Sequence, residues 1–357
     1  YNAFVFYDQT SNYTGKYGIP CGLFDIGGFP NLKIDLLIHL GNISASWPSS
    51  AREIWRVNSD GEIRDTYQHL TKVFEMQEED FFMAYCDYYQ IGQTTQYEKW
   101  HAVYNLRIEA MQNYDNDMAF SSLWIAQNMH KNMPKNSIIH FGILNSLRCW
   151  NCFEIDHSIR GYSNTGGFGI DGGVSSLIGA SFVDFDKIYY GIFGDLAFFY
   201  DMNSLGNKHI ASNVRILVVN NGLGGEFKNS LGNVQKAGLG DLANEYISAY
   251  GHYGEKSPEL LKHYAQDLGF QYLSATDKKS FFVAMKEFTA TEHKEKPMFF
   301  EVFIDEQEDV SALDLIQSLA DFSESEQNVI KKTKKIAKNI LGRKGVKISQ
   351  KIMRKND

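Results

Sequence analysis

Residues 191–204, GIFGDLAFFYDMNS, and residues 215–227, RILVVNNGLGGEF, each join an apolar run to a polar end. The first run ends in a Gly-Asp pair and the second in an Asn-Asn pair. Apolar runs of this kind between helical segments predict parallel strands that are buried on both faces. Because ligands bind at the carboxyl ends of the strands in such sheets, we expect Asp195 and Asn221 to contribute to a binding site.

The same alternation of strands and helices extends along the chain. It predicts an α/β fold in which a parallel sheet is covered by helices on both faces. A single long helical pattern covers about residues 100–133. Further strand-like runs occupy residues 33–41, 52–58, 137–143 and 297–305, and further helical patterns occupy residues 172–182, 240–251 and 257–269.

Charge is distributed unevenly along the sequence. The net charge is −8, yet residues 331–357 contain eleven Lys or Arg residues and one acid. Apolar residues are interleaved with these cations, which predicts contact with an anionic membrane or another polyanion. A solvated helix or a frayed end is the alternative reading of this tail. The acidic remainder argues against a nucleic acid-binding protein.

The number of cysteines bears on the cellular compartment, and the first residues bear on whether the sequence belongs to a longer protein. Four cysteines in 357 residues do not suggest a disulfide framework and favour a reducing, cytoplasmic setting. Cys149 and Cys152 form a C-x-x-C pair, for which redox or metal chemistry is the alternative to simple packing. The sequence starts at Tyr1 and enters a strand-like run directly, so we interpret it as the C-terminal part of a longer protein.

The polar strand ends suggest a specific ligand chemistry. Asp and Asn oxygens are hard ligands that suit Mg²⁺ or Ca²⁺, and Mg²⁺ commonly completes its shell with water and phosphate oxygens. The N–H groups of Leu196 and Ala197 open a helix after Asp195 and offer a seat for an anion. We expect Gly194 to permit a tight turn, and the glycines after Asn221 to let the backbone approach a ligand closely.

Residues 167–172, GFGIDG, form a competing motif of the G-x-G-x-x-G type. In the right context this motif binds a dinucleotide, so a nicotinamide-dependent oxidoreductase is an alternative function. However, polar and glycine-rich sequence precedes the motif where a buried strand is needed, and no acid closes a following strand.

Residues 194–204 and 218–227, together with GYSNTGGFGIDGGVSS at residues 161–176, resemble the pyrophosphate-binding domain of thiamine diphosphate-dependent enzymes. The pattern is most similar to the menaquinone-pathway synthase that makes succinyl-enolpyruvyl-hydroxycyclohexene-carboxylate, and is more distantly similar to acetolactate synthases and phosphonopyruvate decarboxylases. The resemblance implies three parts: residues 1–95 as the C-terminal part of a Rossmann-like middle domain, residues 96–325 as the thiamine pyrophosphate-binding domain, and residues 326–357 as a basic tail outside the pattern.

The resemblance also implies thiamine diphosphate and Mg²⁺ as cofactors. The Asp195 and Asn221 side chains and the Leu223 carbonyl would bind Mg²⁺. Ile170 would hold the cofactor in its V shape, with core packing as the alternative, and the Phe168 carbonyl would accept from its 4′-amino group. The full set of cofactor-binding positions is Phe168, Gly169, Ile170, Gly194, Asp195, Leu196, Ala197, Asn221, Leu223 and Gly224.

The resemblance implies a homodimer or homotetramer that decarboxylates a 2-oxo acid and releases an aldehyde or transfers the product to an acceptor. The family's catalytic glutamate lies in an N-terminal domain that this sequence does not show, so the chain alone is expected to be inactive. A non-catalytic binding or assembly subunit is therefore an alternative. Ser146 and Thr165 are the substrate candidates. The family's two substrate arginines are replaced by Thr165 and Trp150, while Arg148 and Arg160 lie nearby but out of register.

Overall fold

The computed structural model of the protein describes residues 3–27, 34–41, 51–86, 95–114, 118–165, 169–229, 232–252, 257–292 and 294–319. Its main feature is a six-stranded sheet in the order β10-β11-β9-β8-β6-β7, in which every neighbouring pair is parallel. This sheet confirms the predicted α/β class. Its strands are β6 (Ile138–Phe141), β7 (Arg160–Ser163), β8 (Tyr189–Gly194), β9 (Val214–Asn220), β10 (Gln271–Ala275) and β11 (Met298–Phe303).

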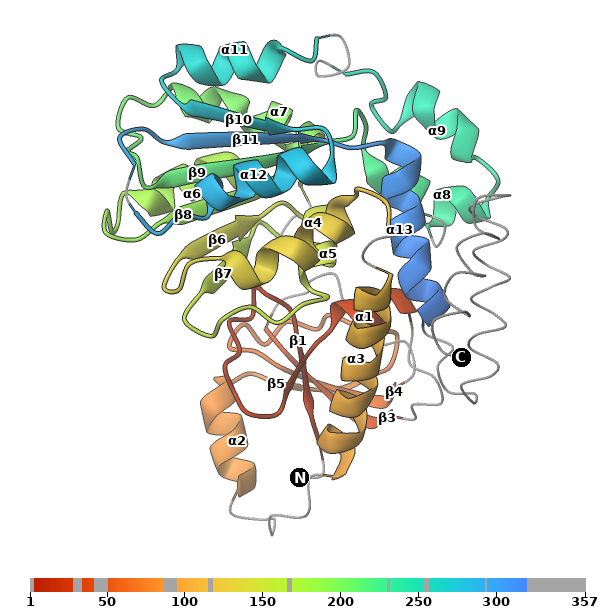
Figure 1. Ribbon diagram of the computed structural model, residues 1–357. Coiled ribbons are helices and arrows are strands. Elements are labelled where there is room, and N and C mark those ends of the chain that lie inside the picture. The colour runs from red at the N-terminus through yellow and green to blue at the C-terminus, as the bar shows by residue number, and fades with distance from the viewer. Residues whose placement is uncertain are drawn as a thin grey trace, which may run out of the picture.

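Helices cover both faces of the sheet (Figure 1). On one face, α4 (Ser122–Met129) and α12 (Lys278–Phe288) contribute to the larger hydrophobic core. On the other face, α6 (Gly173–Ser181), α7 (Asp195–Asp201) and α11 (Leu260–Asp267) contribute to a second core. Consequently all seven residues of β9 are buried, as a central parallel strand requires.

The predicted long helix over residues 100–133 is wrong, because the structure divides this stretch. It contains α3 (Thr95–Asn113), then α4, then the 3₁₀ helix η1 (His130–Asn132). Ser121 starts α4 as its N-cap, and its hydroxyl accepts a hydrogen bond from the Trp124 N–H at 3.2 Å. The remaining helices of the larger unit are α5 (Asn145–Trp150), η2 (Met202–Gly206), η3 (Gly225–Lys228), α8 (Asn233–Lys236), α9 (Gly240–Tyr246) and α13 (Glu306–Leu319).

The N-terminal part contains two small parallel sheets. One pairs β1 (Val5–Tyr7) with β2 (Gly18–Pro20), and the other has the order β3-β4-β5. Leu23 and Phe24 of α1 share the larger hydrophobic core with Trp124, so α1 packs directly onto the six-stranded unit. The domain boundaries at residues 95 and 325 remain predictions. The other elements of this part are α1 (Gly22–Gly27), β3 (Ile34–Leu40), β4 (Ala51–Val57), β5 (Leu70–Phe74) and α2 (Glu78–Cys86).

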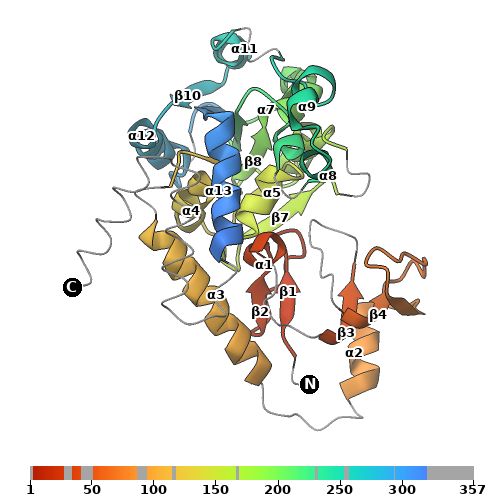
Figure 2. The same ribbon diagram turned by 90° about the vertical axis from the view of Figure 1, so that its right-hand side faces the viewer.

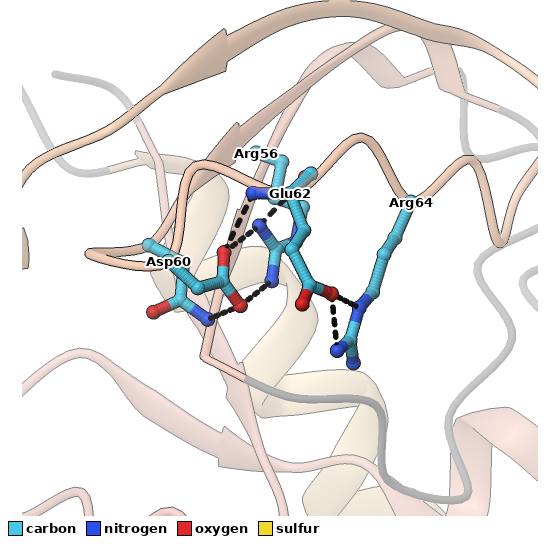
Figure 3. Close-up of polar contacts among 5 residues, drawn as sticks. Arg56, Asp60, Glu62 and Arg64 are labelled. Atoms are coloured by element: carbon cyan, nitrogen blue, oxygen red, sulfur yellow. Dashed lines mark hydrogen bonds and ion pairs between the residues drawn. The ribbon is translucent and has the colours of Figure 1, made fainter.

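A buried arginine closes the turn that follows β4 (Figure 3). The Arg56 side chain is 1% exposed; its Nη2 donates to Asp60 Oδ2 at 2.8 Å, and its Nη1 donates to the Glu62 carbonyl at 2.8 Å. Arg64 pairs with the Glu62 carboxylate beside it. The Arg56 guanidinium holds the pKa of Asp60 well below its usual value. All of these contacts lie within one turn, so we assign the cluster a structural role.

Two groups of predictions cannot be compared with the structure. Phe168 and the basic tail from residue 326 lie outside the described residues. Among the helices that are described, none combines the length and the apolar character that crossing a bilayer requires.

Candidate functional site

The carboxyl ends of β8 and β9 lie side by side because these strands are neighbours in the sheet. Asp195 begins α7 directly after β8 and is 1% exposed. Its Oδ2 accepts a hydrogen bond from the Gly222 N–H at 2.8 Å, and its Oδ1 accepts one from the Leu196 N–H at 2.8 Å. One buried carboxylate therefore joins the Gly-Asp stretch to the Asn-Asn stretch.

Glycines shape the loop after β9. Gly222 has a φ of +78°, a left-handed conformation that strains other residues. The Gly224 N–H donates to the Ser248 carbonyl at 2.6 Å, and a Cβ on Gly224 would lie 3.2 Å from that oxygen. The close approach expected of this loop is therefore seen toward Ser248. The Leu223 side chain between the two glycines is buried.

Gly194 does not have the tight-turn role that the sequence predicts. Its φ of −74° and ψ of 157° are accessible to any residue. A Cβ at this position would meet no atom within 4 Å. The missing side chain instead leaves open space beside Asp195 and the first turn of α7, where Leu196 and Ala197 are half-buried.

Asn221 lies next to a second buried carboxylate, Asp309 of α13. Asn221 Nδ2 donates to Asp309 Oδ2 at 3.3 Å, while Asn221 Oδ1 accepts from the Leu223 N–H at 3.3 Å. Asp309 is 2% exposed, and burial raises the pKa of its carboxyl. Sequence reasoning missed Asp309, because it lies 88 residues from Asn221 and belongs to no recognisable motif.

His252 is the other contact that sequence reasoning missed. Its Nε2 lies 2.8 Å from Asp195 Oδ2, and its ring packs edge-on against Phe199 with 5.1 Å between ring centroids. An ionised carboxylate only accepts hydrogen bonds, so Nε2 carries the proton in this contact. The sequence gives no signal for this pairing, because His252 lies 57 residues after Asp195 and belongs to no motif.

The glycine-rich stretch before α6 lies on a different strand end, after β7. Thr165 and Ile170 are half-buried there, and Gly169 could not carry a Cβ without meeting Asp171 Oδ1 at 2.4 Å. Among the described residues, no hydrogen bond joins Thr165, Gly169 or Ile170 to Asp195 or to the loop after Asn221. The role of this stretch therefore remains a prediction, as does that of the other predicted site residues.

Asp201, which ends α7, has a clear structural role. Its Oδ2 accepts hydrogen bonds from the Ser175 N–H at 2.6 Å and the Ser175 hydroxyl at 2.9 Å. It thereby fastens the C-terminal end of α7 to the first turn of α6, directly after the glycine-rich stretch.

The direction in which successive strands are added to the sheet changes at β6. β7 follows β6 on one side, and β8 lies on the other side of β6. Crevices at such switch points are the usual ligand sites of open parallel sheets. The loop after β6 leads into α5, where Ser146 is half-buried. Ser146 therefore lies on the element that borders the switch point.

Trp150 and Arg148 of α5 are both engaged with other parts of the fold. Trp150, which stands where the family has an arginine, is 2% exposed and packs against Phe141 with 5.5 Å between ring centroids. Trp150 is therefore a core residue. Arg148 Nη1 donates to Asn145 Oδ1 and to Glu226 Oε2, both at 2.8 Å, so its guanidinium spans α5 and η3.

Comparison with curated proteins identifies relatives. The chain is 31% identical over 262 residues to the 2-succinyl-5-enolpyruvyl-6-hydroxy-3-cyclohexene-1-carboxylate synthase of Phocaeicola vulgatus, which corresponds to 73% of this chain and 44% of the relative. It is 35% identical over 193 residues to the synthase of the same name from Christiangramia forsetii, covering 54% of this chain and 31% of the relative. The chain is thus a homologue of these synthases. It spans less than half the length of these relatives.

A solved structure supports the fold of this homologue. The Rhodococcus jostii RHA1 thiamine diphosphate-dependent 4-hydroxybenzoylformate decarboxylase matches with a TM-score of 0.50 and 14% sequence identity, covering 84% of this chain and 54% of that chain. At this identity the match shows a shared fold alone. None of the protein-family models compared with the chain matches it.

The sheet order argues against dinucleotide binding by this chain. The expectation that no buried strand precedes the G-x-G-x-x-G motif is met, since only Gly161 of the four β7 residues is buried. A short strand does precede the motif, because β7 ends at Ser163 and α6 begins at Gly173. However, β7 pairs with β6 at the sheet edge, and the strand after α6 is β8, two places away. The dinucleotide fingerprint needs its ribose-binding acid on the adjacent strand.

The C-x-x-C pair shows no sign of redox chemistry. Cys149 and Cys152 are free and buried, and burial raises the pKa of both thiols above the usual value. A reactive cysteine needs a lowered pKa and some exposure. We therefore assign both thiols to the core.

Proposed function

We propose that this chain forms the diphosphate-binding part of a Mg²⁺- and thiamine diphosphate-dependent enzyme. The enzyme would decarboxylate a 2-oxo acid and then release an aldehyde or transfer the remaining group to an acceptor. The observation that carries this proposal is the hydrogen bond between Asp195 and the Gly222 N–H, which brings the two motif stretches together at adjacent strand ends. The synthase name of the curated relatives supports a transferase or lyase.

The donor set at this position fits Mg²⁺. Among the described residues, no group of three His, Cys, Asp or Glu side chains is placed to hold a metal ion. A cation would instead be held by the Asp195 carboxylate, the Asn221 amide oxygen and the Leu223 carbonyl, with water and phosphate oxygens completing its shell. This mixed oxygen set is one that Mg²⁺ accepts.

The open space at Gly194 supports a diphosphate position beside α7. A Cβ there would meet no atom within 4 Å, so the site has room next to the Leu196 and Ala197 backbone. Gly224 and the stretch that includes Phe168, Gly169 and Ile170 would enclose the rest of the cofactor. Bound thiamine diphosphate would supply the electron sink for decarboxylation. The chain's own residues would bind and orient it, and the proton-transferring glutamate would come from another domain of a homodimer or homotetramer.

The substrate is a small 2-oxo acid whose identity remains open in this proposal. Trp150 is in the core and Thr165 is uncharged, so neither can replace the family's arginines as a carboxylate ligand. Ser146 and Thr165 would instead offer hydroxyl groups. A different substrate from the pair used by the menaquinone-pathway synthase follows from this change.

A second candidate is a binding or assembly subunit that keeps the fold without catalysis. Trp150 and Thr165, which stand in place of the family's substrate arginines, favour it, because a subunit without substrate turnover does not need these arginines. The four cysteines favour the cytoplasm for either candidate. A membrane or polyanion contact through the basic tail remains a proposal for either candidate as well.

The test is a calorimetric titration of the full-length protein with thiamine diphosphate, with Mg²⁺ and again with a chelator. We expect binding that depends on Mg²⁺ and is lost in Asp195→Ala. Asp186→Ala is the control, because it removes an exposed carboxylate before β8, at the opposite end of that strand. Equal binding by wild type and Asp195→Ala would overturn the metal assignment. Turnover in a screen of 2-oxo acids would then separate the enzyme from the binding subunit.

A further inference from the structure

Asp309 connects four separate elements from one buried position. Its Oδ1 accepts from the Ser122 N–H at 2.7 Å, at the first turn of α4. Its Oδ2 faces the amide groups of Asn221 at 3.3 Å, after β9, and of Asn145 at 3.5 Å, on α5. Figure 2 shows α13, which carries Asp309, running between α4 and α5.

The orientation of both amides follows from their other partners. Asn145 Oδ1 faces Arg148 Nη1 at 2.8 Å, and an arginine can only donate. Asn221 Oδ1 faces the Leu223 N–H, which also can only donate. Each amide must therefore turn its NH₂ group toward Asp309. A carboxylate accepts both NH₂ groups, whereas a side chain with its own NH₂ would compete with them.

These contacts extend into a ring around the loop after β9. Arg148, oriented by Asn145, pairs with Glu226 Oε2 at 2.8 Å, and Glu226 lies five residues after Asn221. Gly225 between them has no room to spare, because a Cβ would lie 3.2 Å from Asn145 Nδ2 and 3.4 Å from Asn221 Nδ2. The loop is therefore held from both ends by groups that Asp309 orients.

We propose that Asp309 is the positioning residue that presents the amide oxygen of Asn221, and not its NH₂ group, to the divalent cation. This inference rests on the proposed function, since it concerns a ligand of the proposed cation. Asp309 acts through Asn221, and it connects the cation site to α13. Partners that orient metal ligands typically change metal affinity 10- to 100-fold when they are removed.

The test measures cation affinity of the full-length protein directly, with Mn²⁺ as the paramagnetic probe and thiamine diphosphate present. Asp309→Asn keeps the size of the side chain and an oxygen for the Ser122 N–H, but it turns an NH₂ group toward Asn221. We expect Mn²⁺ to bind about 10-fold or more weakly. The control is Glu308→Gln, which removes an exposed charge from the same turn of α13 and should leave the affinity within about twofold of wild type.

An exchange of the two side chains separates positioning from general damage to the fold. In the double variant Asn221→Asp with Asp309→Asn, the new amide donates to the new carboxylate, which keeps its other oxygen for the cation. We expect the double variant to bind Mn²⁺ more tightly than either single variant. A structural role alone would lower the melting temperature without this rescue.

The Mn²⁺ titrations separate a failure of this inference from a failure of the proposed function. Wild-type affinity in Asp309→Asn, or a double variant no better than the single variants, overturns the positioning role while the cation site stands. A wild-type protein that binds no Mn²⁺ with thiamine diphosphate overturns both. If Asp309→Asn fails to fold, the comparison of the double variant with Asn221→Asp still decides the question.

Discussion

His252 Nε2 donates a hydrogen bond to Asp195 Oδ2 over 2.8 Å, across 57 residues of sequence. A carboxylate offers about four lone-pair sites. His252, the Gly222 N–H and the Leu196 N–H together use three of them. A cation at Asp195 is therefore left with one site unless His252 moves away.

The first prediction follows from this competition. His252→Phe keeps a ring against Phe199 but removes the donor to Asp195, so we expect divalent cations to bind about 3- to 10-fold more tightly. Mn²⁺ titration in the presence of thiamine diphosphate measures this change. His263→Phe, on the exposed surface of α11, is the control and should have no effect. Weaker binding in His252→Phe would show that His252 supports the carboxylate instead of competing for it.

The second prediction uses the open space at Gly194. Its backbone dihedrals suit alanine, so Gly194→Ala should fold with unchanged or slightly higher stability, by up to about 1 kcal/mol. The added methyl group would occupy the space proposed for the diphosphate, so thiamine diphosphate affinity should fall about 10-fold or more. Gly179→Ala on α6, which also meets no atom within 4 Å, is the control. Full cofactor affinity in Gly194→Ala would place the diphosphate elsewhere.

The parts of the fold that the sequence predicted are those governed by local patterns. β8 and β9 are continuous apolar runs between helices, so their burial and parallel pairing could be predicted, and with them the proximity of Asp195 to the loop after Asn221. The break between α3 and α4 escaped prediction, because Ser121 as an N-cap is a weak signal within a long helical pattern. The short edge strand β7 is polar, so its periodicity gave no signal.

The parts of the site that escaped prediction are held by contacts between distant segments. His252 and Asp309 reach the site from segments without a motif, and their roles depend on tertiary packing alone. Trp150 is the opposite case. The family pattern has a substrate arginine at its position, but the large apolar side chain of Trp150 is buried in the core.

The third prediction concerns acid. His130 and His140 are buried, and burial lowers the pKa of each to about 4 from 6.5. Folding therefore favours their neutral forms. The stability that results is fully present above pH 6.5 and is lost as the pH falls toward 4, by up to about 3 kcal/mol per histidine.

Urea denaturation between pH 7 and pH 4 checks this expectation. His140→Phe should flatten the pH dependence, because His140 Nε2 has no hydrogen-bond partner among the described residues and its ring already lies 5.4 Å from that of Tyr162. His157→Phe, a change at an exposed histidine, serves as the control. An unchanged slope in His140→Phe would contradict the prediction.

The fourth prediction tests the buried arginine of β9. Arg215 is fully buried, and its Nη1 donates to the Phe288 carbonyl at 2.7 Å and to the Tyr190 hydroxyl at 2.9 Å, while its Nη2 donates to the Glu292 carbonyl at 3.0 Å. It thus satisfies carbonyl groups at and beyond the C-terminal end of α12, which otherwise have no helical partners.

Arg215→Met fills similar volume but removes the guanidinium donors to the Phe288 and Glu292 carbonyls, and leaves the Phe288 carbonyl with the Tyr190 hydroxyl at 3.3 Å. We expect the free energy of unfolding to fall by about 2–4 kcal/mol, since each unsatisfied buried acceptor costs about 1–3 kcal/mol and relaxation of the helix end recovers part of it. Arg215→Lys should recover part of the loss, because an ammonium group reaches fewer acceptors than a guanidinium. Urea denaturation at pH 7 measures both variants. A loss below about 1 kcal/mol in Arg215→Met would mean that water replaces the guanidinium, and that the apolar packing of α12 through Phe281, Ala284, Met285 and Phe288 holds this helix to the sheet.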